Sequence, residues 1–104
     1  MNKLWEAIDV INERGWIQGA LEKEDGVCIL GAYRRAWGIN PAMPWSLDLQ
    51  MATKADKDME LLDQVAMEQF NKNGFVNLND DPETTKADVI LALEKAAIMK
   101  YELV

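Results

Sequence analysis

The chain has 104 residues, of which 49% are hydrophobic and 28% are charged, and this is the composition of a single globular domain. Its formal net charge of −7 disfavours general binding to the phosphate backbone of nucleic acids. The longest apolar run, residues 89–93, is too short to cross a bilayer, so we expect no membrane insertion.

Histidine is absent and Cys28 is the only cysteine. These two facts exclude Ser-His and Cys-His nucleophile pairs, the commonest zinc ligand and an internal disulfide. A lone cysteine fits the reducing cytoplasm, and no N-terminal stretch resembles a signal peptide. We therefore expect one cytoplasmic domain over residues 1–104, with no metal or cofactor. We also expect that it is not an enzyme, although chemistry based on carboxylates or on a metal stays open.

The first predicted element is an amphipathic helix that begins after Asn2, a plausible N-cap, and ends at Arg14. Gly15 follows as a natural helix stop. Residues 16–21 form a short connecting segment, and Asp25-Gly26 is a turn signal.

A second helix is predicted over residues 27–37. Its residues Cys28, Gly31 and Ala32 are small enough for another element to approach closely, and Cys28 is expected to be a buried core residue. Pro41 and Pro44 then require a loop.

Trp45 is expected to hold that loop against the body of the domain, and Ser46 to cap a short helix over residues 47–52. The segment 53–56 resembles a capping box, which favours a break or kink there, so residues 47–72 are read as one helix or two. The long amphipathic helix that follows ends at Asn73-Gly74.

Residues 75–78 mix apolar and polar side chains and are predicted to be extended. Thr85 and Asp88 form a second capping-box pattern, which starts a last helix over residues 86–101. This helix is apolar nearly all round, as in a central core helix or the interface of a homodimer. The predicted fold class is therefore all-α, a compact bundle of four to five helices with a short extended segment near 75–78.

The polar segment 77–83 has three open interpretations. Its Asn and Asp side chains suit a turn in which they bond their own backbone amides. Residues 69–80 also follow a spacing like that of an EF-hand calcium loop, although Gln69 replaces the first carboxylate and Asp80 the bidentate glutamate. The third interpretation is a recognition surface for a partner or ligand.

Arg34-Arg35 is the only adjacent basic pair in the chain. One arginine is expected to pair with the acidic surface, and the other is available to bind a phosphate or carboxylate. Trp16 or Trp37 is a candidate to stack against a base.

Three ordered motifs carry a family resemblance: residues 15–19 (Gly-Trp-Ile-Gln-Gly), 26–32 (Gly-Val-Cys-Ile-Leu-Gly-Ala) and 79–82 (Asn-Asp-Asp-Pro). With them, the chain resembles a small domain family of unknown function that occurs in actinobacteria and bacteriophages. The resemblance is weak between residues 39 and 73, and Leu78 stands where the family tends to carry Trp. It implies a compact helical domain of a kind that phages can carry, and it carries over no activity. The pattern of the closing helix is matched by Thr85, Asp88, Val89, Leu93, Ala96 and Ala97.

Packing and capping explain most of these motif residues, but they do not demand the polar side chains of Gln18, Asn79 and Asp80. The motifs that carry these residues, 15–19 and 79–82, lie next to predicted helix ends. We therefore expect them to converge as a site on one side of the domain. The functional hypothesis is a small acidic interaction module, a phage or mobile-element protein that binds and modulates a host protein. The alternative is a protein that binds or sequesters a small, nucleotide-like ligand. The candidate binding residues are Trp16, Gln18, Arg34, Arg35, Asn79 and Asp80.

Overall fold

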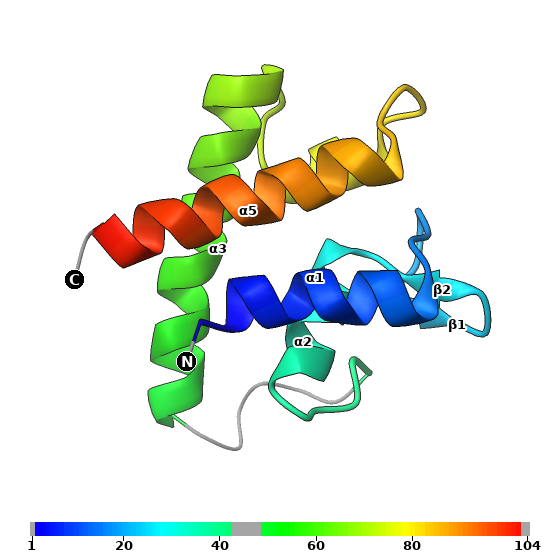
Figure 1. Cartoon of the computed structure of the whole chain (residues 1–104), viewed down its shortest axis with the longest axis horizontal. Coiled ribbons are helices and arrows are strands. Elements are labelled where there is room, and N and C mark those ends of the chain that lie inside the picture. The colour runs from blue at the N-terminus through cyan, green and yellow to red at the C-terminus, as the bar shows by residue number, and fades with distance from the viewer. Residues whose placement is uncertain (1, 43–48, 103–104) are drawn as a thin grey trace.

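The computed structural model describes residues 2–42 and 49–102 and shows a mainly helical domain (Figure 1). The predictions for Trp45 and Ser46 lie outside the described residues. Among the described residues, five helices accompany one small two-stranded sheet, which confirms the predicted fold class. In order, the elements are α1 (Lys3–Arg14), β1 (Glu22–Lys23), β2 (Gly26–Val27), α2 (Ile29–Ala36), α3 (Leu49–Phe70), α4 (Phe75–Asp80) and α5 (Lys86–Glu102).

Helix α1 begins and ends where the sequence predicts. The side-chain oxygen of Asn2 accepts a hydrogen bond from the backbone N–H of Leu4 at 3.1 Å, as an N-cap does. Its amide nitrogen donates to the carbonyl of Ala97 at 3.0 Å, so the same side chain joins α1 to α5. The N–H of Gly15 bonds the carbonyl of Ile11 at 2.8 Å and closes the helix.

The second helix is shorter than predicted. It begins at Ile29, because Gly26–Val27 pairs instead with Glu22–Lys23 in an antiparallel hairpin. The carbonyl of Val27 also accepts from the N–H of Ile17 at 3.0 Å, and this contact holds the connecting segment beside the hairpin. These backbone bonds satisfy groups that the predicted helix would have used, and neither strand is long enough to show a period in the sequence.

The predicted break at residues 53–56 is wrong, because α3 runs without interruption from Leu49 to Phe70. A capping-box pattern expresses only a local preference. No glycine or proline stands in this stretch to remove a helical hydrogen bond or to favour another backbone conformation, so the helix continues through it.

The predicted extended segment at 75–78 is also wrong, because these residues lie in helix α4. Phe75 and Leu78 are both buried and one helical turn apart, a spacing that places them on one face of a helix but on opposite faces of a strand. Gly74 has no side chain to cap the helix, and the Asp63 carboxylate accepts from the N–H of Phe75 at 2.9 Å in its place. A cap supplied from α3 is invisible to local sequence patterns.

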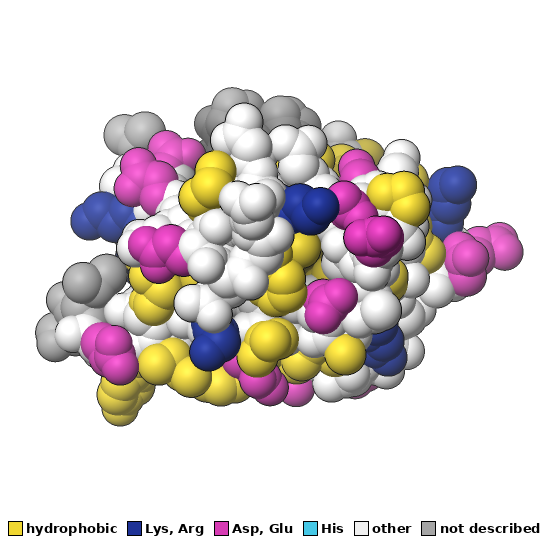
Figure 2. All heavy atoms as spheres, turned by 90° about the horizontal axis from the view of Figure 1, so that it is seen from above, with side chains coloured by type: hydrophobic (Ala, Val, Ile, Leu, Met, Phe, Trp, Pro, Cys, Tyr) yellow, Lys and Arg dark blue, Asp and Glu magenta, His cyan; other side chains and the backbone are white. Residues whose placement is uncertain are grey.

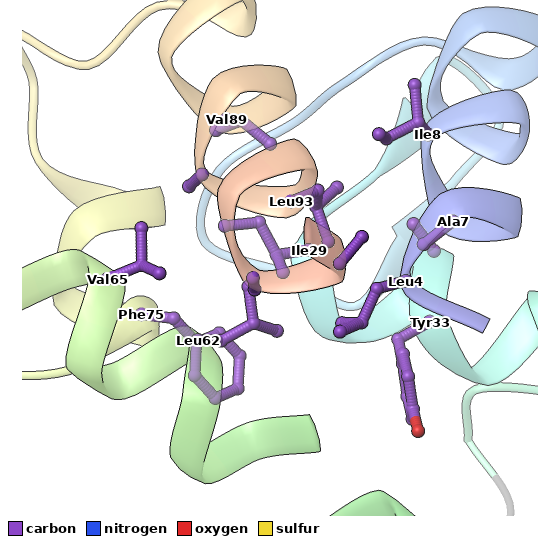
Figure 3. Packing of buried hydrophobic residues seen from close by; sticks show 14 of the residues in the cluster. Leu4, Ala7, Ile8, Ile29, Tyr33, Leu62, Val65, Phe75, Val89 and Leu93 are labelled. Carbon is purple, nitrogen blue, oxygen red and sulfur yellow. The ribbon is translucent and has the colours of Figure 1, made fainter. Parts of the chain in front are cut away.

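Helix α5 crosses the domain between α1 and α3, with which it shares most of its contacts (Figure 1). Thr85 and Asp88 form the predicted capping box: the Thr85 hydroxyl accepts from the N–H of Asp88 at 3.2 Å, and the Asp88 carboxylate from that of Thr85 at 3.0 Å. Figure 3 shows Leu93 and Val89 inside the core, with side chains of α1, α2 and α3 around them. Of the described helices, none has the length and apolar character needed to span a bilayer.

A close backbone contact fixes how α2 packs on the hairpin. Gly31 lies against Leu21, and a Cβ at position 31 would stand 1.9 Å from the Leu21 carbonyl oxygen. Only glycine permits this approach, which explains the small residue in the second sequence motif.

We expect Gly31→Ala to lower the free energy of unfolding by about 3 kcal/mol or more, because the methyl group forces backbone atoms apart. Gly38→Ala is the matched control: it has open space around it and only a left-handed backbone, so it should cost about 1 kcal/mol. Urea denaturation followed by circular dichroism measures both values. Equal losses would mean that the contact with Leu21 relaxes freely.

Candidate functional site

Asn79, the centre of the site predicted from sequence, is buried on α4 with only 3% of its surface exposed. Its side-chain oxygen accepts two hydrogen bonds, from the indole N–H of Trp16 at 2.8 Å and from the backbone N–H of Ile29 at 3.1 Å. Its amide nitrogen donates to the Ile17 carbonyl at 3.2 Å and to the Asp80 carboxylate at 3.0 Å. All four hydrogen-bonding positions of the amide are therefore used within the chain.

Gln18 and Asp80 complete this group. The amide nitrogen of Gln18 lies 3.0 Å from the Asn79 carbonyl and 2.7 Å from that of Asp81, and it donates to both. The Asp80 carboxylate accepts from the backbone N–H of Gly19 at 3.0 Å. The structure thus brings together four of the predicted residues, Trp16, Gln18, Asn79 and Asp80, which we call the Asn79 cluster.

The contacts of the Asn79 cluster join segments far apart in the chain. Residues 16–19 contact α4 and the turn after it, and Ile29 begins α2. The polar side chains of Gln18, Asn79 and Asp80 therefore form hydrogen bonds with backbone groups that would otherwise lack a partner in the folded chain. The geometry supports a structural role for the cluster, with the exposed part of Asp80 left at the surface.

The turn interpretation of segment 77–83 holds from Asp81 onward and is wrong for residues 77–80, which lie in α4. The Asp81 carboxylate accepts from the N–H of Glu83 at 2.8 Å and pairs with Lys72, whose hydrogen bond lowers the pKa of that carboxyl. The EF-hand spacing does not correspond to a loop, because residues 75–80 are helical. Within residues 2–42 and 49–102, no group of three or more His, Cys, Asp or Glu side chains is placed to hold a metal.

Arg34 and Arg35 bind partners outside the Asn79 cluster. Arg35 makes two hydrogen bonds to the Glu22 carboxylate, one from Nε at 2.7 Å, and this contact lowers the pKa of Glu22. Arg14 also approaches Glu22, at 3.3 Å. Arg34 donates to the carbonyl of Pro41 and so ties the following loop to α2. The sequence placed both arginines among the candidate ligand-binding residues, and both already have partners within the chain.

A small apolar pocket of about 190 Å³ lies next to the Asn79 cluster and is partly lined by Cys28. Cys28 is half-buried, less than the sequence predicted, and its sulfur caps α2 by accepting from the N–H of Gly31 at 3.4 Å. Burial raises the pKa of the Cys28 thiol, which keeps it protonated at neutral pH. The pocket is apolar and too small for a metabolite of ordinary size.

Helix α5 carries a second apolar face opposite the buried one. Leu91, Ile98 and Tyr101 are 41%, 47% and 78% exposed, and their helical spacing places them on one side. We call these three residues the outer face of α5. The charged residues Glu94, Lys95 and Glu102 lie along the same side. Helix α5 is apolar nearly all round in sequence because it has two apolar faces: one lies in the core and the other is exposed.

A family model described as a family of unknown function, DUF6197, matches residues 2–98, so the chain belongs to that family. This confirms the resemblance to a small domain family of unknown function. No curated protein and no solved structure matches the chain. Family membership assigns no activity, and the function has to be inferred from the surfaces of the domain.

We expect Asn79→Ala to lower the free energy of unfolding by about 3 kcal/mol, because it leaves the Trp16 indole N–H and the Ile29 N–H buried without an acceptor. Asn77→Ala on the same helix is the control. Asn77 is exposed, and among the described residues its side chain bonds the Asn73 carbonyl, so its loss should stay near 0.5 kcal/mol. Urea denaturation measures both. Near-equal stability of the two variants would contradict a structural role for Asn79 and favour a ligand-binding one.

Cys28 should react slowly with thiol reagents. Because its pKa is raised and its side chain is half-buried, we expect alkylation by iodoacetamide at pH 8 to be at least about tenfold slower than for a cysteine in an unfolded peptide. The rate is measured by mass spectrometry, with the urea-unfolded protein as the reference. Equal rates in the folded and unfolded protein would show that the thiol is open to solvent.

Proposed function

We propose that this member of the DUF6197 family is a small acidic interaction module that binds and modulates a host protein through the outer face of α5. The proposal places the protein in the cytoplasm and gives it no enzymatic activity. Its phage or mobile-element origin rests on the sequence resemblance. The observation that carries the proposal is the exposure of three large apolar side chains on one side of α5.

Exposed apolar side chains gathered on one face are typical of a protein–protein contact. Figure 2 shows hydrophobic side chains in a row along the lower edge of the view, with acidic side chains beside them. This edge is the front of Figure 1, where α5 lies. Tyrosine and large aliphatic residues inside a charged rim form the usual anatomy of an interface centre.

Charge defines the chemistry of the proposed partner. The net charge of −7, with Glu94 and Glu102 beside the outer face, favours a protein that presents an apolar groove edged by lysine and arginine. Such a contact forms quickly at low salt and weakens as salt screens the charges.

The alternative, a nucleotide-like ligand held by Trp16 and the arginine pair, has less support. The Trp16 indole donates to Asn79, Arg35 pairs with Glu22, and Arg34 binds a backbone carbonyl. Each group would have to leave a partner in order to bind a ligand there.

We expect the tagged protein to recover a host protein from bacterial lysate, and the variant Leu91→Ser/Ile98→Ser to recover at least about tenfold less, because the loss of buried anchors at an interface costs about 2 kcal/mol or more. The control is Met67→Ser, which removes an equally exposed apolar side chain from α3. Recovery is read by mass spectrometry and repeated with the purified partner at low and high salt.

Two results would contradict this assignment. Equal recovery by Leu91→Ser/Ile98→Ser and the wild type would remove the outer face from the interaction. A wild-type dimer in light scattering that becomes a monomer in this variant would make α5 a homodimer interface, and so replace the host partner by a second copy of the chain.

A further inference from the structure

Three lysines meet at one pocket, although acidic side chains outnumber basic ones in this protein by eighteen to eleven. Lys54 and Lys57 come from the first half of α3, and Lys100 from the last turn of α5. The pocket has a volume of about 530 Å³, within the range of sites that bind metabolites. We call it the lysine pocket. Its remaining walls are Asp58, Glu60, Leu61 and Gln64.

One charge in the lysine pocket is already balanced. Asp58 has no exposed surface, and its carboxylate accepts hydrogen bonds from the Tyr33 hydroxyl and from Lys100 at 3.1 Å. The Lys100 ammonium also lies 2.9 Å from the other carboxylate oxygen. This pairing offsets the cost of burying the Asp58 charge and holds Lys100 against Asp58 in the wall of the pocket. Burial, together with the hydrogen bond to Asp58, raises the pKa of Tyr33 and keeps it a donor.

Two positive charges remain without a partner within the described residues. Lys54 and Lys57 are exposed and form no ion pair in residues 2–42 and 49–102, although Glu60 lies one helical turn beyond Lys57. With Asp58 matched by Lys100, the described lining residues leave Lys54 and Lys57 against one carboxylate, that of Glu60. The lysine pocket therefore attracts anions, against the charge of the molecule as a whole.

We propose that the lysine pocket binds a small molecule that carries a phosphate group, with Lys54 and Lys57 on the phosphate. A phosphomonoester has nearly two negative charges at neutral pH, which the two lysines balance. Lysine binds phosphate as a point charge from a flexible stem, and so it needs no preformed cradle. Leu61 offers an apolar surface to the rest of the ligand. Gln64 donates to Glu68 at 3.1 Å, which leaves its side-chain oxygen as an acceptor.

The site is independent of the outer face of α5, because the two share no residue. It also differs from the nucleotide site expected at Trp16 and the arginine pair. Failure of either proposal therefore leaves the other to be judged on its own experiment.

The test is a titration of the ¹⁵N-labelled protein with inorganic pyrophosphate and with adenosine monophosphate at low salt. We expect saturable binding, with amide shifts confined to residues 54–64 of α3 and the end of α5. Lys54→Gln/Lys57→Gln should weaken it at least about tenfold, since each lost charge contact contributes more than about 0.7 kcal/mol in a partly desolvated site. The control Lys23→Gln/Lys86→Gln changes the net charge equally at exposed lysines elsewhere and should alter affinity less than about twofold.

Several outcomes overturn the proposal. One is an equal loss of affinity in both double variants, and another is a set of amide shifts centred outside residues 54–64 and the end of α5. The third is that neither probe saturates below about 10 mM, which corresponds to a binding free energy weaker than about 3 kcal/mol. Vesicles that contain phosphatidic acid separate a lipid headgroup from a soluble ligand. Co-sedimentation with these vesicles, without binding of either soluble probe, would assign the pocket to a membrane lipid and reject the small molecule. Circular dichroism confirms that both double variants are folded.

Discussion

The buried amide of Asn79 is the constraint on which the rest of the domain depends. It gives the Trp16 indole and the first N–H of α2 an acceptor, and it holds the Ile17 carbonyl, so that three segments far apart in sequence meet at one side chain. Without it, the non-helical stretch between α1 and α2 would bury polar groups with no partner, at a cost of about 3 kcal/mol, which is a large fraction of the stability of a small domain. The hairpin lies between the two segments that this amide joins, residues 16–17 and the start of α2.

The sequence predicted those elements whose signals are local. Helix α1 has its cap at Asn2, and α5 has Thr85 and Asp88, which act within one turn of the chain. The sequence-based prediction was wrong for two elements whose deciding contact comes from another part of the chain. Helix α4 receives its cap from Asp63 on α3, and the strand Gly26–Val27 is defined by pairing with another short segment. Both segments are so short that their sequence pattern alone does not decide the secondary structure.

The sequence predicted part of the candidate site, but the structure gives these residues a structural role in place of the expected binding role. Gln18 and Asn79 stood out because packing does not demand polar side chains there, and they do converge. Their hydrogen bonds show a second reason for a polar residue at such a position: buried backbone N–H and C=O groups need a hydrogen-bond partner. The lysine pocket was missed, because nothing in the sequence brings Lys100 of α5 to α3. One signal was present: Asp58 occupies a core position on the apolar stripe of α3, and a charge there needs a buried partner.

Helix α5 links the domain's stability to both proposed binding regions. Its inner face fills the core, its outer face is apolar and exposed, and Lys100 reaches back to Asp58 beside the lysine pocket. Lys100 and Tyr101 are neighbours in sequence but point to different surroundings, the first toward a buried carboxylate and the second toward solvent. A substitution at Lys100 would leave a buried charge unpaired and so disturb folding together with binding. Substitutions at Lys54, Lys57, Leu91 and Ile98 leave the core contacts in place, because these side chains lie outside the buried set. Function can therefore be dissected on this helix and its neighbour without loss of the fold.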